Sequence, residues 1–236
     1  MKSIACTIQY GQSVIDYHLS FLNRKSLEIA VYPDKRIVVK APATSSMAAI
    51  EAKIKKRAHW IKKQIAYFNQ FEPRTPVRQY LGGESHRYLG RQYRLKIERA
   101  ERNRILLKNG YFYIESTENH PLHIQALLNE WYKQKAKIYL VKIFDECWNI
   151  FNKKGLEKPF LKIQAMEKRW GSLSPKKQLT LNLRLIQASK ECIEYVIAHE
   201  LCHLVHPNHG SDFYNLLEQT MPDWLRRKHK LELSLI

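Results

Sequence analysis

Apolar residues in the first seventy positions are spaced first as strands and then as a helix. Up to residue 40, short runs rich in β-branched and aromatic residues are interrupted by polar and turn-forming residues, which is typical of β structure. From Met47 to Phe68 the apolar side chains recur at intervals of three and four, so the pattern predicts one amphipathic helix. The expected strands are residues 14–21, 27–32 and 36–40.

A second strand-forming region follows between residues 79 and 114. Its clearest signal is Asn109-Gly110 between two apolar runs, because this dipeptide suits the two-residue turn of a β-hairpin. The polar stretch Ser116–Pro121 is then the best division point, and a loop inside one compact body is the alternative interpretation. We therefore expect an N-terminal, β-rich and basic domain of residues 1–120 with one amphipathic helix.

The remaining residues, 121–236, combine helical patterns with short strands. A broad apolar side from Ile124 to Phe151 predicts a long helix, and a second helical pattern covers residues 191–205. The expected strands between them are residues 160–166 and 178–186. The chain is thus expected to be of the α+β class, with a small sheet and a functional helix in its second domain.

The chain is strongly basic, with a formal net charge of +18 at pH 7. Residues 1–120 hold 22 basic and 10 acidic side chains, whereas residues 121–236 hold 18 and 12. An excess of positive charge attracts polyanions, so one interpretation is that the protein binds nucleic acid or an acidic partner. The other interpretation is that the basic residues form a solvated surface. For the lysine-rich side of the helix at 47–68, a solvated face is the preferred interpretation.

Membrane and disulfide-rich classes are disfavoured. The chain has no run of 18 apolar residues, and its first residues reach Gly11 and Asp16 too early to form the apolar region of a signal peptide. The four scattered cysteines, which form no C-x-x-C pair, are Cys6, Cys147, Cys192 and Cys202. We therefore expect a protein of the reducing cytoplasm.

The strongest chemical signal is H-E-x-x-H, formed by His199, Glu200 and His203 in an apolar-flanked helix. Residues four apart differ by about 40° around the helix axis, so the two imidazoles can bind one small ion. Glu200 lies about 100° from His199, where it can reach a water bound to that ion rather than the ion itself. In catalytic sites Zn²⁺ is bound by three protein ligands and one water. The metal lowers the pKa of this water to about 7.

A third protein ligand has to come from beyond this helix, which Pro207 is expected to stop near His206. His206 lies on the same side as His199, but its Cα is roughly 10 Å further along the axis. His209 follows the turn and can be returned toward the ion, so it is the preferred candidate. Asp212 is the other candidate.

Several short stretches in both halves of the chain are similar to the sequence of a known protein family. They are Arg169–Ser172, Asn182–Ile186, Tyr195–His203, His209–Tyr214, Pro222–Trp224, Ala41-Pro42, Trp60-Ile61 and Leu89-Gly90. Together they resemble the YgjP-like metallopeptidase family, which is related to the SprT-like and WLM zinc proteases of the zincin (gluzincin) kind. The resemblance covers nearly the whole chain. Leu173 departs from it, since members often have cysteine after Trp-Gly-Ser.

This resemblance implies a zincin-like C-terminal domain of residues 121–236 with metallopeptidase activity. The H-E-x-x-H-x5-H spacing equals that of the WLM proteases, in which all three histidines bind zinc and the glutamate is the catalytic base. It therefore implies one Zn²⁺ held by His199, His203 and His209. Glu200 would be the general base in the hydrolysis of protein or peptide substrates.

Substrate contacts are expected around this site. The strand at 179–185 is expected to lie beside it, so that an extended peptide adds to the strand edge. Trp170 is a candidate wall of the substrate site, with a packing tryptophan as the alternative. Asn182 and Tyr214 are further candidates for substrate contact, and Tyr214 or His206 for stabilisation of the oxyanion.

Two other functions stay open. A nucleic-acid-binding module with a structural zinc would need a fourth ligand such as Cys202 or Asp212, although Cys202 follows His199 by three residues, where its direction is wrong. A protease recruited to DNA by residues 1–120, as the SprT-like and WLM relatives suggest, is compatible with the charge.

Overall fold

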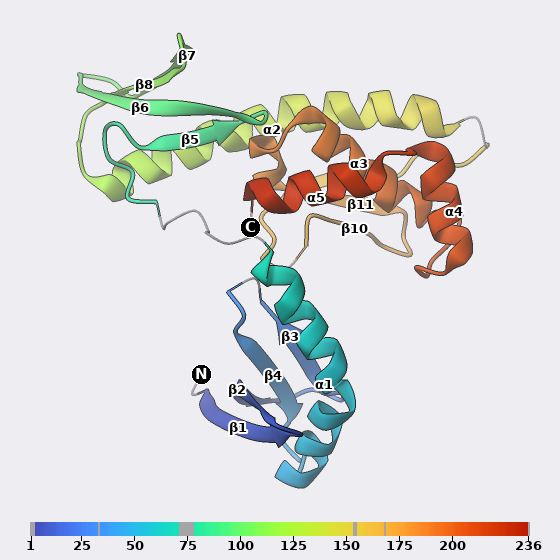
Figure 1. Ribbon diagram of the computed structural model, residues 1–236. Helices are drawn as coiled ribbons and strands as arrows, with labels where there is room; N and C mark the ends of the chain where they lie inside the picture. The colour runs from blue at the N-terminus through green and yellow to red at the C-terminus, as the bar shows by residue number, and fades with distance from the viewer. Residues whose placement is uncertain (1–2, 33, 71–77, 153–154, 168, 236) are drawn as a thin grey trace. The chain divides into compact units, whose positions relative to one another are not determined.

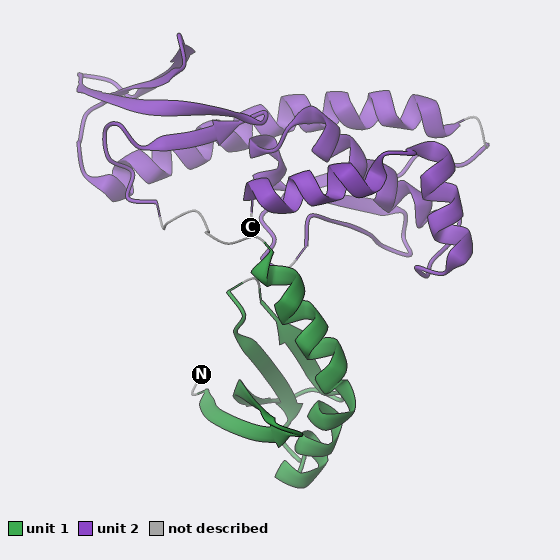
Figure 2. Cartoon of the chain, viewed as in Figure 1, with its two compact units in different colours: residues 1–75, 236 green, residues 76–235 purple. Residues whose placement is uncertain are grey.

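The computed structural model describes residues 3–32, 34–70, 78–152, 155–167 and 169–235. The chain forms two compact units, residues 1–75 with 236 and residues 76–235 (Figure 2). The described residues form five α-helices and three small sheets, so the fold is of the mixed α+β kind that the sequence predicts (Figure 1). In the described part of the chain, the helices are too short or too polar to cross a membrane.

Unit 1 is one sheet covered by one helix. The strands are β1 (Ile4–Tyr10), β2 (Ser13–Leu22), β3 (Glu28–Val31) and β4 (Ile37–Pro42), in the order β1-β2-β4-β3. β2 and β4 pair in parallel and the other pairs are antiparallel. The three predicted strands correspond to β2, β3 and β4. β1, which the sequence analysis does not delimit, forms the sheet edge beside β2.

Helix α1 (Met47–Asn69) covers this sheet, as its amphipathic pattern predicts. It begins at Ser46, whose Oγ accepts a hydrogen bond from the backbone N–H of Ala49 at 3.3 Å. The apolar stripe is fully buried and consists of Ile50, Ile54, Ala58 and Ile61. The lysines of the opposite side are exposed.

Unit 2 begins with a four-stranded sheet packed on a long helix. The strands are β5 (Ser85–Tyr88), β6 (Arg91–Arg99), β7 (Arg104–Lys108) and β8 (Tyr111–Ser116), in the order β5-β6-β8-β7, and the helix is α2 (Pro121–Phe151). β7 and β8 form the predicted hairpin, in which Asn109 and Gly110 have φ values of 50° and 80°. Both central residues therefore adopt the positive φ that a tight hairpin turn requires.

This sheet belongs to unit 2, whereas the sequence analysis placed it with the N-terminal domain. Buried Phe112 contacts Trp131 of α2 with ring centroids 5.1 Å apart. In addition, the backbone N–H of Leu89 donates to the Ile186 carbonyl at 2.9 Å. The compact units therefore divide near residue 75 rather than at residue 120, because the hairpin sheet and α2 share one apolar core.

The rest of unit 2 surrounds a three-stranded sheet. Its elements are β9 (Phe160–Gln164), β10 (Gly171–Leu173), β11 (Gln178–Asn182), the 3-10 helix η2 (Leu183–Gln187), α3 (Lys190–Cys202), α4 (Ser211–Thr220) and α5 (Trp224–Leu235). The expected strand at 178–186 ends at Asn182, and its second half is η2. The Asn182 Oδ1 accepts from the backbone N–H of Arg184 at 3.1 Å, which caps η2 and stops the strand.

Candidate metal centre

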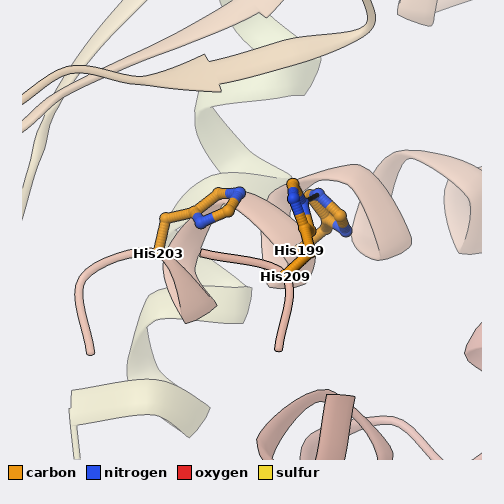
Figure 3. Close-up of side chains that lie close together, drawn as sticks. All are labelled: His199, His203 and His209. Carbon is orange, nitrogen blue, oxygen red and sulfur yellow. Dashed lines mark hydrogen bonds between the residues drawn. The ribbon is translucent and has the colours of Figure 1, made fainter. Parts of the chain in front are cut away.

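Three histidines from one helix end and the following loop converge in unit 2. His199 lies in the last turn of α3, and His203 is the residue that caps its C-terminus. His209 lies beyond the turn at Pro207, one residue before Gly210, which precedes α4. Figure 3 shows the ring of His203 directed toward the neighbouring rings of His199 and His209.

The three side chains bring their ligand atoms together. One nitrogen from each ring lies within 4.8 Å of the others, and the Nε2 atoms of His199 and His209 are 3.0 Å apart. Within the described residues this group has three members, so neither Cys202 nor Asp212 supplies a fourth ligand. The arrangement fits one metal ion and leaves a coordination position for solvent or substrate.

Phe213 packs against all three histidine rings, and a backbone carbonyl orients the ring of His203. Phe213 of α4 is fully buried, and its ring centroid lies 5.0, 4.7 and 4.6 Å from those of His199, His203 and His209. The Nδ1 of His203 is 3.1 Å from the backbone carbonyl of His206. A proton on that nitrogen donates to the carbonyl and leaves Nε2 free for a metal. His206 therefore serves the site through its backbone.

Burial favours the neutral form of two of the three imidazoles, those of His199 and His209. It lowers the pKa of His199 to about 3, and the neighbouring histidines act in the same direction. Burial also lowers the pKa of His209, with smaller contributions from the charges of His203 and Lys228. Neutral imidazole is the form that binds metal, so burial favours the metal-binding form of His199 and His209.

Glu200 lies beside the cluster with only 7% of its surface exposed. Burial raises the pKa of this carboxyl to about 7, while a backbone hydrogen bond from Leu173 and the charge of Arg169 oppose the shift. Gly171 provides the space for it, because a Cβ at that position would lie 2.7 Å from the Glu200 Cγ. A carboxyl poised near neutral pH can both accept and return a proton.

A cavity of about 800 Å³ opens over the histidines and Glu200. One wall is β10 and the turn after it, and another is the side of α3 that carries Tyr195, His199 and Glu200. The residues that line it are Arg169, Trp170, Gly171, Ser172, Leu173, Ser174, Pro175, Tyr195, Val196, His199, Glu200, His203, Pro207 and His209. The volume is sufficient for a peptide segment.

The structure distributes the other candidate residues differently. Trp170 lines the cavity and is half-buried, with the Arg184 guanidinium 5.5 Å from its ring. Tyr214, which stacks on Trp224, and the His206 side chain are not among the lining residues. Asn182 is also outside the lining, and its amide nitrogen donates to the Met166 and Arg169 carbonyls at 2.7 and 2.9 Å.

The strand beside the site also differs from expectation. β11 lies at the centre of its sheet, between β10 and β9. β10 is the edge strand, and its residues line the cavity next to Glu200. Sequence analysis missed β10 because it is three residues long and contains Gly171 and Ser172, which do not show strand alternation. It also missed Phe213 and Tyr195, whose roles depend on contacts between helices.

Metallopeptidases of the H-E-x-x-H kind have this arrangement, in which the two histidines of the helix lie near a further ligand and a carboxyl. The family described as YgjP-like, metallopeptidase domain, matches residues 25–234. The chain therefore belongs to the YgjP-like metallopeptidase family.

Two solved metallopeptidase zymogens are also similar to this chain. Abylysin of Pyrococcus abyssi is 18% identical with a TM-score of 0.36, and the match covers 39% of this chain and 90% of that one. Jannalysin of Methanocaldococcus jannaschii is 27% identical with a TM-score of 0.36, covering 41% and 90%. No significant match is found among curated proteins.

Proposed function

We propose that this chain is a zinc-dependent peptidase in which His199, His203 and His209 hold the ion and Glu200 is the general base. The observation that carries the proposal is the convergence of three imidazoles beside one buried carboxyl at the wall of an 800 Å³ cavity. The donor set fits Zn²⁺, which takes nitrogen ligands and keeps an open position in catalytic sites.

The metal and Glu200 have separate tasks. Bound zinc polarises the scissile carbonyl and lowers the pKa of a water to about 7. Glu200 takes the proton of the attacking water on its carboxylate oxygen and returns it to the leaving amine nitrogen. The raised pKa of Glu200 supports both steps, because a pKa of about 7 makes the carboxyl a moderate acid as well as a base.

The cavity indicates how a peptide is held. β10 (Gly171–Leu173) pairs with β11 on one side, and its residues line the cavity. We propose that an extended peptide adds to this edge as a further strand, which is the arrangement of a zincin-like domain. Trp170 forms the wall at one end of the strand.

For the oxyanion, the cavity favours Tyr195 over Tyr214 and His206. Tyr195 lines the cavity one helical turn before His199, and its ring centroid is 6.0 Å from that of His199. Burial raises the pKa of Tyr195, and the neighbouring Tyr214 and Glu200 add to the shift. The hydroxyl therefore stays protonated and can donate a hydrogen bond to a developing negative charge.

The cellular setting that we propose is the reducing cytoplasm, with proteins or peptides as substrates. None of the four cysteines, Cys6, Cys147, Cys192 and Cys202, forms a disulfide. Free thiols are ordinary where glutathione and thioredoxin keep cysteines reduced.

Metal analysis and peptide cleavage on the same samples test the proposal. We expect His209→Ala to lose bound zinc, and His206→Ala, whose side chain is outside the cluster, to keep it. Glu200→Gln should keep zinc while cleavage falls by about 10²–10⁴-fold. Wild-type cleavage rates in Glu200→Gln would exclude the general-base role, and full zinc content in His209→Ala would exclude the three-histidine site.

A further inference from the structure

The sheet β5-β6-β8-β7 has one face packed on α2 and one face open. Phe112 of β8 and Leu95 of β6 are buried on the packed side, and Phe112 contacts Trp131 and Tyr132 of α2 at centroid distances of 5.1 and 6.1 Å. Successive side chains of a strand point to opposite faces. The side chains next to these residues in the strands therefore lie on the other side of the sheet, away from α2.

The strand register places two tyrosines at the centre of this second face. Tyr111 and Tyr113 alternate with Phe112 on β8, and their ring centroids are 5.8 Å apart. Tyr111 lies between Arg94 and Lys108, and Tyr113 between Lys96 and Leu106. We call these six residues the open face: Arg94, Lys96, Leu106, Lys108, Tyr111 and Tyr113.

The open face is accessible and slightly hollowed. Tyr111 is 37% exposed and Leu106 is 39% exposed, and the three cations are exposed as well. The Lys96 ammonium lies 5.1 Å from the centroid of the Tyr113 ring. A cavity of about 270 Å³ lies at this face, and its lining includes two acidic side chains as well as two basic ones. The lining residues are Lys96, Glu98, Leu106, Lys108, Asn109, Tyr113, Ile114 and Glu115. None of these residues takes part in the metal centre.

The charge of this side of the sheet is positive at the tyrosines. Its strand positions carry five basic side chains and two acidic ones. The basic residues are Arg87, Arg94, Lys96, Arg104 and Lys108, and the acidic ones are Glu98 and Glu115. Glu98 and Glu115 are opposite each other in the register, four residues along their strands from Arg94 and Tyr111. Glu115 is also opposite Arg104, and Glu98 forms an ion pair with Lys96 at 3.1 Å, so Arg94 and Lys108 are the cations nearest to Tyr111.

We infer that the open face binds single-stranded nucleic acid. Two aromatic rings on alternate residues of one strand offer consecutive platforms for unpaired bases, and flanking cations neutralise the phosphates. The bases of a duplex are already stacked on one another, so they cannot use both rings. An apolar protein partner fits poorly, because Leu106 is the one aliphatic side chain among the six residues. The cations of the open face come from β6 and β7, so the strand register brings them beside the two tyrosines of β8.

Binding of a fluorescent 12-nucleotide single strand, measured by anisotropy, tests this inference in the full chain. We expect Tyr111→Ala and Tyr113→Ala each to weaken affinity about 5-fold or more, since stacking on one aromatic ring is worth at least that factor. Tyr10→Ala is the matched control. Tyr10 is also 37% exposed and has Lys62 at 5.4 Å from its ring, but it lies in unit 1. It should bind as the wild type does.

A second pair of variants separates stacking from charge. Arg94→Ala with Lys96→Ala should make the slope of log affinity against log salt shallower by about 1.4, because each phosphate that a side chain neutralises contributes roughly 0.7 to that slope. Lys55→Ala with Lys56→Ala, which removes the same charge from the exposed side of α1, should leave the slope unchanged. Phe at both tyrosine positions should restore affinity, because the ring is kept.

Three outcomes would overturn the inference. One is an equal decrease of affinity in the Tyr10 and Tyr113 variants, and another is a decrease at Lys55 and Lys56 that matches the decrease at Arg94 and Lys96. The third is tighter binding of a duplex of the same sequence than of the single strand. Circular dichroism melting of each variant shows whether the fold is retained, and the Phe variants keep the test valid if the Ala variants unfold.

Discussion

The two cores of this molecule differ in the kind of side chain that they bury. In unit 1 the sheet and α1 enclose an aliphatic cluster with one tyrosine, in which Leu19, Val39 and Ile54 are fully inaccessible. The buried histidine, serine, threonine, asparagine and glutamate side chains of the described residues all lie in unit 2. They are His86, Ser116, Thr180, Asn182 and Glu200.

The comparison shows that the buried group with an energetic cost lies at the candidate metal centre of unit 2. Most of the polar groups buried in unit 2 have partners: the Ser116 hydroxyl donates to the Glu118 carbonyl at 2.7 Å, and the Asn182 amide makes three hydrogen bonds. A buried polar group that keeps its hydrogen bonds changes the free energy of folding little. Glu200 is different, because burial raises its pKa and its ionised form is therefore destabilised in the fold. Among its described residues, unit 1 buries no carboxyl group.

The largest expected effect is a loss of stability when a substitution creates a cavity in the core of unit 1. Ile54→Ala should lower the free energy of unfolding by about 2–5 kcal/mol, because Ile54 is fully buried and the surroundings cannot fill the space. Denaturant unfolding measures this, with Met47→Ala as the control, since Met47 is 43% exposed on the same helix. Zinc content of the folded protein should be unchanged. A decrease of zinc content in folded Ile54→Ala would show that the two cores do not have separate roles.

A smaller effect is expected at Gly171, whose backbone lies against the Glu200 side chain. In Gly171→Ala the new Cβ would lie 2.7 Å from the Glu200 Cγ, so the carboxyl has to move at a cost of about 1–3 kcal/mol. We expect kcat for peptide cleavage to fall about 10-fold or more while zinc is retained. Gly82→Ala is the matched control, since a Cβ there has no neighbour within 4 Å. Equal activity of the two variants would show that Glu200 tolerates displacement.

The smallest effect concerns a second carboxyl of unit 2. Burial raises the pKa of Glu232 on α5 to about 7, above the ordinary value of 4.5. The folded state therefore holds a proton that the unfolded state loses between pH 4.5 and 7, and stability falls as the pH rises through this window. Glu232→Gln should stabilise the protein by about 1–2 kcal/mol at pH 8, with a small effect at pH 4.5.

Unfolding curves at the two pH values measure this effect. Glu101→Gln, at an exposed carboxyl of the same unit, is the control and should change little. A gain of the same size at both pH values would mean that the titration of Glu232 is not its cause.

Local signals in the sequence were sufficient for much of the fold and for the centre of the site. The three- and four-residue spacing of Ile50, Ile54 and Ile61 predicts α1, and Asn109-Gly110 predicts the hairpin, because both depend on neighbours in the chain. The H-E-x-x-H spacing and the turn at Pro207 indicate the three histidines that the structure brings together.

The remaining features depend on contacts between distant segments. The unit boundary lies near residue 75 because β5–β8 pack on α2, and no residue near 120 signals this packing. The role of Gly171 follows from its approach to Glu200, 29 positions away in the chain, and Phe213 reaches the histidines from α4. Asn182 was a candidate for substrate contact, yet its amide nitrogen is occupied by backbone carbonyls.

The three hydrogen bonds of Asn182 also restrict how this region can change in length. One amide holds the carbonyls of Met166 and Arg169, and it also holds the start of η2 at Arg184. An insertion between Met166 and Arg169 would remove at least one carbonyl from reach and release the segment that leads into β10. The turn between β10 and β11 carries no such restraint from Asn182. Natural length variation should therefore occur in that turn, while the segment before β10 keeps a constant number of residues.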